Sequence, residues 1–315
     1  MTLSVEMLLC RSVLQCLARG GFMEKQADDI FRVTLLGTGA PPPVLDRFGP
    51  STLVEVGAEK FIFDAGRGAM QRIHQLGIPF ADISGIFLTH HHSDHVVGFP
   101  DLWLTGWIGR PWGKRKVPLP VWGPEGTKQM MEYLPKAFAV DIRVRSENYP
   151  PNGVKLVADE FTEGMVFDQD GIKITAFEVD HFAEQLPAYG YRIDYRGRSA
   201  VLSGDTTYNE NLIRHSQGTD LLVHEVVAAS NDGPENAEQL KRITSNHTTP
   251  EQAGEIFSRV KPRLAVYTHL LLFGDAKPED LIPATRKNYS GPLEVGEDLL
   301  RLEISDKVAA HRFSG

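Results

Sequence analysis

The sequence predicts a single mixed α/β domain over residues 31–315, preceded by a helical extension over residues 1–30. From Phe31 onward, short stretches rich in β-branched and aromatic residues alternate with stretches of helical periodicity. The 315 residues contain no internal repeat, low-complexity tract or obvious linker, which favours one domain. With 42% hydrophobic and 23% charged residues, the chain has the composition of a globular protein with a substantial core.

The extension is predicted to form an amphipathic helix. Its apolar residues recur at alternating steps of four and three, which places them on one helix face: Leu3, Met7, Cys10, Leu14 and Leu17. This helix either packs on its own domain or mediates self-association. The segment lacks a basic region and a cleavage site, and it is too short and too polar to span a membrane. We therefore expect a cytoplasmic protein whose two cysteines do not pair.

Within the domain, the residue pattern predicts alternating strands and helices. Strands are predicted over residues 31–36, 51–56, 60–64, 82–90, 118–124, 170–181, 188–195, 198–206, 219–227, 262–269 and 298–304. Helices are predicted over residues 66–76, 95–108, 127–138, 247–260 and 278–289. Thr248 and Glu251 are expected to form a capping box for the helix over 247–260, with Pro250 in its first turn. Residues 141–170 are expected to be irregular.

A histidine cluster directly follows one of the apolar strands. The stretch THHHSDHVVG places four histidines and one aspartate within residues 90–95. His90 and His92 are two residues apart in a turn that leaves a strand, a spacing that suits one metal ion. Asp94 and His95 lie further round the turn and can reach a second ion. Imidazole and carboxylate ligands without thiolate favour zinc, with manganese and iron as alternatives.

Polar residues also end many of the other predicted strands. A rigid sheet positions side chains at its rim, so strand ends are where α/β proteins build sites. Any one of these residues has a simpler explanation as a cap or turn residue, but together they indicate a site: Asp64, His90, His181, Asp205, Glu225 and His269. A carboxylate such as Asp205 in a rigid turn is suited to bridge two cations. Two divalent ions would hold a bridging hydroxide at neutral pH, which is a nucleophile.

These motifs resemble the metallo-β-lactamase-fold hydrolases. Within that group the chain is most similar to the ribonuclease Z-like branch, which includes arylsulfatase-like enzymes. The segments that match are LLGTGAPPP, FDAGRG, the histidine motif, the pair His224-Glu225 and the run NHTT at 246–249. The resemblance covers residues 31–305 and implies a four-layer αββα sandwich with the site at one edge of the two sheets.

The resemblance also implies a role for each site residue. One ion would be bound by His90, His92 and His181. The other would be bound by Asp94, His95 and His269, with Asp205 bridging the two.

Asp64 would orient a ligand histidine without binding metal itself. Glu225 and His247 would form an acid relay in which His247 protonates the leaving-group oxygen and Glu225 holds its ring. Asp94, Glu225 and His247 are the residues expected to act in catalysis. The resemblance further implies a homodimer.

The chain departs from tRNA-processing members of that branch. Those members carry a long arm between the counterparts of His181 and Asp205, and here only 23 residues separate the two. The loop PPPVLDRFGPST also differs, and the net charge is −8. These features disfavour a nucleic-acid partner and favour a small-molecule ester as substrate, whether a phosphodiester, an aryl sulfate, a carboxylic ester or a lactone.

Three alternatives stay open. The first is a ribonuclease Z-type endonuclease that processes tRNA 3′ ends. The second is a di-iron redox member, although those usually have a glutamate where His92 stands. The third is a degenerate structural member, which the complete ligand set argues against.

Several aromatic residues are candidates for substrate contact. Trp103 and Trp107 are four residues apart and share a helix face, which either packs on the sheet or forms a wall over the metals. Trp112 and Phe48 lie in predicted loops and are further candidates. The basic run at 114–116 is expected to be a solvated loop, with a phosphate contact as the alternative.

Overall fold

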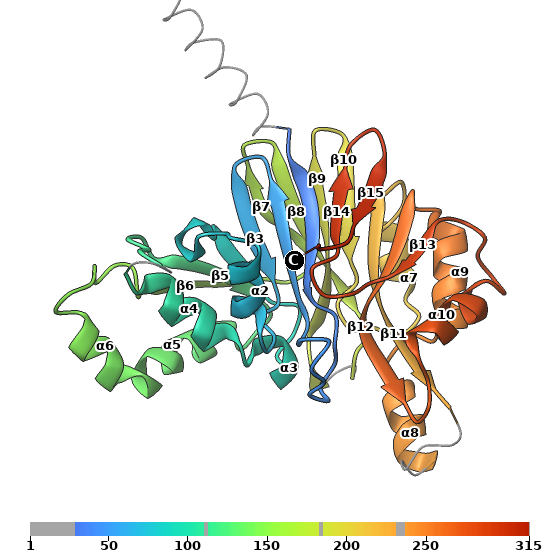
Figure 1. The fold of residues 1–315 in the computed structure, drawn as a ribbon, viewed down its shortest axis with the longest axis horizontal. Coiled ribbons are helices and arrows are strands. Elements are labelled where there is room, and N and C mark those ends of the chain that lie inside the picture. The colour runs from blue at the N-terminus through green and yellow to red at the C-terminus, as the bar shows by residue number, and fades with distance from the viewer. Residues whose placement is uncertain (1–28, 110–112, 183–184, 231–236, 315) are drawn as a thin grey trace, which may run out of the picture.

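The computed structural model describes residues 29–109, 113–182, 185–230 and 237–314. The predicted N-terminal helix and Trp112 lie outside the described residues. Two β-sheets pack face to face, with helices on both outer faces (Figure 1). This arrangement is the four-layer αββα sandwich, so the predicted fold class is confirmed.

One sheet has eight strands, the other seven. In sheet order the eight are β15 (Val308–His311), β14 (Arg301–Ile304), β1 (Phe31–Gly37), β2 (Ser51–Val56), β3 (Glu59–Phe63), β4 (Gly85–Phe87), β5 (Leu119–Gly123) and β6 (Leu156–Glu160). The seven are β13 (Leu293–Val295), β12 (Leu264–Phe273), β11 (Leu221–Ala229), β10 (Arg198–Leu202), β9 (Ala188–Tyr195), β8 (Ile172–Val179) and β7 (Gly164–Gln169). Each sheet has a parallel part, from β3 to β6 in the first and from β10 to β13 in the second.

Helices cover the outer face of each sheet (Figure 1). Those beside the eight-stranded sheet are α2 (Ala69–Gln75), the 3-10 helix η1 (Phe80–Asp82), α3 (Ser93–Val96), α4 (Phe99–Trp107), α5 (Thr127–Ala137) and α6 (Ala139–Arg145). Those beside the seven-stranded sheet are α7 (Glu210–His215), α9 (Pro250–Val260) and α10 (Pro278–Thr285). The helix α8 (Ala237–Thr244) lies apart, beyond the ends of β11 and β12.

Side chains of the strands alternate between the space between the two sheets and the outer faces covered by helices. In β9, Tyr189, Tyr191 and Ile193 point between the two sheets, whereas Ala188 faces the helices on the outer side. Burial of these side chains is the main force that holds the layers together. The hydroxyl of Tyr191 donates to the carbonyl of Leu88 across the core, so its burial leaves no unpaired polar group.

The structure corrects three expectations about elements. Residues 141–170 are not irregular, because they include the end of α6 and the strands β6 and β7. The helix predicted over 95–108 is two helices, since Pro100 has no N–H to continue the hydrogen-bond ladder from α3. The capping box of α9 is formed by Thr249 and Gln252, one residue later than predicted, because Pro250 is the first helical residue and the residue before it is the cap.

Candidate metal centre

The candidate ligands follow the carboxyl ends of strands that meet at one edge of the sandwich. Asp64 follows β3 and the histidine motif follows β4, two parallel neighbours. Asp205 follows β10 in the parallel part of the other sheet. Parallel strands end at the same sheet edge, so residues far apart in sequence come together there.

His269 reaches the site in a different way. β12 does not end at this residue, as the sequence predicted, but continues to Phe273. The pairing of β11 with β12 shifts register between Glu225 and Val226, and His269 has a left-handed backbone with φ 45°. A bulge of this kind redirects one side chain out of the regular alternation. The bulge therefore turns His269 toward the site in the middle of a continuous strand.

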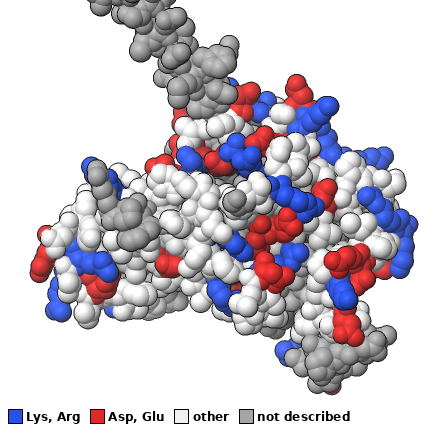
Figure 2. All heavy atoms as spheres, in the orientation of Figure 1, with Lys and Arg blue, Asp and Glu red and all other residues white. Residues whose placement is uncertain are grey.

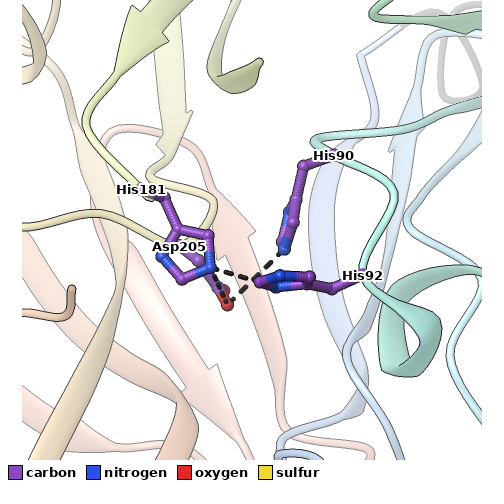
Figure 3. A group of neighbouring side chains, drawn as sticks. All are labelled: His90, His92, His181 and Asp205. Atoms are coloured by element: carbon purple, nitrogen blue, oxygen red, sulfur yellow. Dashed lines mark hydrogen bonds and ion pairs between the residues drawn. The ribbon is translucent and has the colours of Figure 1, made fainter. Parts of the chain in front are cut away.

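Two groups of ligand atoms meet around Asp205. The first group is His90, His92, His181 and Asp205, and the second is Asp94, His95 and His269. In each group the ligand atoms lie within 4.8 Å of one another. Figure 3 shows the first group, with His90 and His92 on one side of the Asp205 carboxylate and His181 on the other.

One oxygen of Asp205 lies between the two groups. Its Oδ2 atom is 3.8 Å from His90 Nε2 and 3.7 Å from His181 Nε2 in the first group. The same atom is 3.4 Å from His95 Nε2 and 3.3 Å from His269 Nε2 in the second. The carboxylate thus stands where a ligand shared by two cations would stand.

Hydrogen bonds on the far side of each ring fix which nitrogen faces the site. Asp64 Oδ2 accepts from His95 Nδ1 at 2.8 Å and from the Thr89 hydroxyl at 2.8 Å. The Thr89 oxygen in turn lies 2.9 Å from His90 Nδ1 and accepts its proton. His181 Nδ1 donates to the carbonyl of Asn246 at 2.9 Å. These bonds direct Nε2 of His90, His95 and His181 toward the site, which is the atom each ring would offer to a metal.

The donor set fits divalent cations. The buried Nε2 atoms of His90 and His95 have no hydrogen-bond partner among the described residues. Burial, reinforced by His95, holds the pKa of His90 well below its ordinary value, so its imidazole is neutral. Burial alone would raise the pKa of Asp205, but the surrounding histidines, His269 foremost, hold it well below the ordinary value. Imidazoles around a carboxylate, with no thiolate, are ligands of zinc-like ions.

Glu225 and His247 form a buried pair beside these ligands. His247 Nδ1 donates to Glu225 Oε1 at 3.1 Å. Burial lowers the pKa of His247, but the Glu225 carboxylate more than offsets this and raises the pKa to about 9. The imidazole is therefore protonated at neutral pH. Its centroid is 4.9 Å from that of His181 and 5.8 Å from that of His269, so the proton is held at the site.

Of the two alternatives for Trp103 and Trp107, the structure shows packing in the core and not an aromatic wall over the metals, so Trp107 is not placed to contact a substrate. This side chain is fully buried, its ring packs on Tyr149, and its indole N–H donates to the carbonyl of Pro150. Trp103 is buried too and donates to the carbonyl of Val154. Both tryptophans belong to the core beneath α4, because the shared helix face points toward the sheet.

Two further expectations concern loop residues. Phe48 is half-buried, and the guanidinium of Arg72 lies 4.2 Å from its ring centroid. Lys114 and Lys116 are exposed in a loop as expected, but Arg115 is 3% exposed, so the expectation of a solvated loop is wrong for Arg115. Its guanidinium donates to the carbonyls of Gly153 and Trp103 and so links the loop at Gly153 to α4.

Sequence reasoning missed two residues that hold the ligands in place. Thr89 precedes the histidine motif and bonds both Asp64 and His90. Asn246 precedes His247, and its carbonyl accepts from His181 while its amide donates to the carbonyl of Arg242 in α8. The sequence shows only that Thr89 and Asn246 directly precede motif residues. Which of their atoms forms a hydrogen bond to a ligand depends on the tertiary structure.

The family model of the Beta-lactamase superfamily domain matches residues 59–270, which include every candidate ligand. The chain belongs to the β-lactamase superfamily. It is accordingly a superfamily hydrolase with a divalent-metal site. Ribonuclease Z of Mycobacterium bovis (strain BCG / Pasteur 1173P2) is 36% identical over 281 residues, which cover 87% of this chain and 99% of that protein. Ribonuclease Z of Mycolicibacterium gilvum (strain PYR-GCK) is 34% identical over 289 residues, 89% of this chain and 99% of that protein.

Solved structures of superfamily members share the fold. YhfI from Bacillus subtilis has a TM-score of 0.70 and 19% identity over 88% of this chain and 100% of that one. The short form of human tRNase Z has a TM-score of 0.64 and 22% identity over 87% of this chain and 98% of that one. Within the residues that the structure describes, none of the helices has the length and apolar character that crossing a bilayer requires. The sequence analysis disfavoured a nucleic-acid partner. The curated relatives are named ribonuclease Z, and this name conflicts with that expectation.

Proposed function

We propose that this hydrolase is a metal-dependent phosphodiesterase that cleaves RNA near the 3′ end of precursor tRNA. The curated relatives support this proposal, because both proteins named ribonuclease Z align with almost their whole length. The protonated His247 beside the ligand groups is the observation that favours a phosphodiester as the bond that is cleaved. A proton held there suits a leaving group that departs as an alkoxide, which a phosphodiester provides.

The metal ligands are proposed to hold two divalent cations of the zinc type, with Asp205 between them. Bound cations would supply positive charge to the phosphate oxygens and lower the pKa of water toward neutrality. The protein contributes rigidity, because Asp64, Thr89 and Asn246 hold three of the ligand rings by hydrogen bonds. Asp94 belongs to the second group, and its Oδ2 lies 3.4 Å from His269 Nε2.

Glu225 and His247 are proposed to deliver the proton. Glu225 Oε1 also accepts from the backbone amides of Thr206 at 3.2 Å and Thr248 at 3.1 Å, so the carboxylate cannot rotate away. A fixed carboxylate keeps the Nδ1–H of His247 in place and leaves Nε2 as the atom that donates to the leaving oxygen. Glu225 lies in β11, and His247 lies in the connection between α8 and α9, three residues before α9 begins.

A second candidate is the hydrolysis of small phosphodiesters. Apart from residues 183 and 184, the interval between His181 and Asp205 is described and consists mainly of the paired strands β9 and β10. Acidic and basic side chains are interspersed over the face drawn in Figure 2, with no continuous basic surface among its coloured residues. Both observations favour a substrate smaller than a folded RNA.

One assay separates the two candidates. The zinc- or manganese-loaded protein is given a precursor tRNA with a 3′ trailer and, separately, bis(p-nitrophenyl) phosphate. Asp205→Ala and His247→Ala serve as inactive controls. Cleavage at the trailer junction supports the RNA substrate. Turnover of the small diester alone favours the second candidate, and activity that persists in both variants contradicts the proposed site.

A further inference from the structure

Phe182 has an unusual backbone at the edge of the metal centre. It directly follows the ligand His181 and has φ 55°, in the left-handed region that bulky residues rarely occupy. Such a conformation persists only where the surroundings hold it, and residues of this kind are concentrated at functional sites. A glycine would adopt the same turn without strain. We therefore looked to the aromatic ring for the function that offsets the backbone strain of a phenylalanine at this position.

The ring of Phe182 stands against two ligand histidines. Its centroid is 4.8 Å from that of His181 at 84° between the planes, and 5.3 Å from that of His92 at 82°. It is thus perpendicular to both imidazoles and stacked on neither. The side chain is only partly buried and belongs to none of the hydrophobic clusters formed by the described residues.

We propose that Phe182 is a stacking platform for a nucleobase of the substrate. This inference rests on the proposed phosphodiesterase function and adds the chemical class of the group beside the cleaved bond. Bases stack on aromatic rings in most single-stranded RNA sites, without a need for a particular sequence. In a nucleotide one sugar separates the base from the phosphate. A ring that touches two ligand histidines is therefore within reach of the base when the phosphate lies at the metal centre.

The other rings considered for substrate contact are occupied. Trp103 and Trp107 are buried in the core, and the guanidinium of Arg72 lies over the ring of Phe48. Phe182 is the described candidate whose ring both borders the ligands and is partly exposed. An apolar ring in that position costs free energy in water, and stacking with a base would recover it.

The test compares two ligands that share a phosphate monoester and differ in the base. Binding of adenosine 5′-monophosphate and of ribose 5-phosphate to the zinc-loaded full chain is measured by calorimetry. We expect the nucleotide to bind about tenfold more tightly to the wild type. Phe182→Leu should abolish this preference, Phe182→Trp should keep it, and affinity for ribose 5-phosphate should stay unchanged in both. Tyr133→Leu, which removes an exposed ring on α5, is the matched control.

The outcomes are distinct. Equal binding of the two ligands by the wild type, or a preference that survives Phe182→Leu, overturns the inference. A loss of affinity for both ligands in Phe182→Leu also overturns it, because the ring would then serve only to hold His92 and His181. The protein could also show a base preference that depends on Phe182 and yet cleave no phosphodiester. That result would support the base-binding subsite and contradict the proposed function.

Discussion

His247 donates through Nδ1 to Glu225 Oε1 at 3.1 Å, and that oxygen also accepts the backbone amides of Thr206 and Thr248. Three donors on one buried oxygen hold the carboxylate in one orientation. The consequence is a histidine whose pKa of about 9 keeps it protonated at neutral pH, a state that a lone buried histidine would not adopt.

Glu225→Gln should shift the alkaline limb of the pH–rate profile to lower pH. The wild-type carboxylate raises the pKa of His247, so the acid form persists until the pH approaches 9. Without the negative charge, the pKa should fall toward the ordinary histidine value of about 6.5, and activity should be lost over that lower range. The measurement is kcat against pH for a phosphodiester whose leaving group is an alkoxide, because p-nitrophenolate departs without needing a proton. Glu255→Gln, on the exposed side of α9, should leave the profile in place; an unchanged profile in Glu225→Gln would count against the acid relay.

Thr89→Val should weaken metal binding, whereas Thr89→Ser should not. The hydroxyl of Thr89 accepts from His90 Nδ1 and donates to Asp64, so valine leaves both polar groups without this partner. Loss of a hydrogen bond that orients a ligand typically costs about 10- to 100-fold in metal affinity. Competition with a zinc chelator measures the effect. Unchanged metal affinity in Thr89→Val, or a loss in Thr89→Ser as large as that in Thr89→Val, would count against the orienting role of the hydroxyl.

Removal of metal should lower the melting temperature. Binding to the folded state stabilises it by mass action, by about 4 kcal/mol when free metal is at about 1,000 times Kd. The wild type should therefore melt at a lower temperature in chelator than in zinc. Asp205→Asn removes the charge between the two ligand groups and should show a much smaller difference. The same difference in both proteins would place the stabilising metal elsewhere.

Trp107→Phe should affect stability and spare catalysis. The indole N–H donates to the carbonyl of Pro150, and phenylalanine loses this hydrogen bond. A hydrogen bond of this kind contributes about 0.5–1.5 kcal/mol to stability, and denaturant unfolding can measure the loss. The KM for bis(p-nitrophenyl) phosphate should not change. A raised KM at unchanged stability would restore the substrate wall that the sequence suggested.

Residue type and strand position were sufficient to group the strand-end residues into one site, whereas their roles as ligands of two ions were implied by the family resemblance. Strand ends of parallel sheets meet at one edge, so Asp64, His90 and Asp205 could be grouped from hydrophobic pattern alone. His269 was grouped correctly for a different reason, because it is a bulge and not a strand end. Helical spacing showed that Trp103 and Trp107 lie on the same helix face. It did not show whether that face packs against the sheet or borders the metal centre. Phe182 carries no signal in sequence, since its role depends on φ and on rings contributed by other elements.

The bulge at His269 has a consequence for how the rim of the site can vary. Beyond it, β11 and β12 remain paired for four more residues each, from Val226 to Ala229 and from Leu270 to Phe273. Changes in the length of this two-stranded ribbon would move its far end and leave His269 and Glu225, which precede it, in place. The bulge thus divides β12 into a part that positions a candidate ligand and a part whose length is free to change.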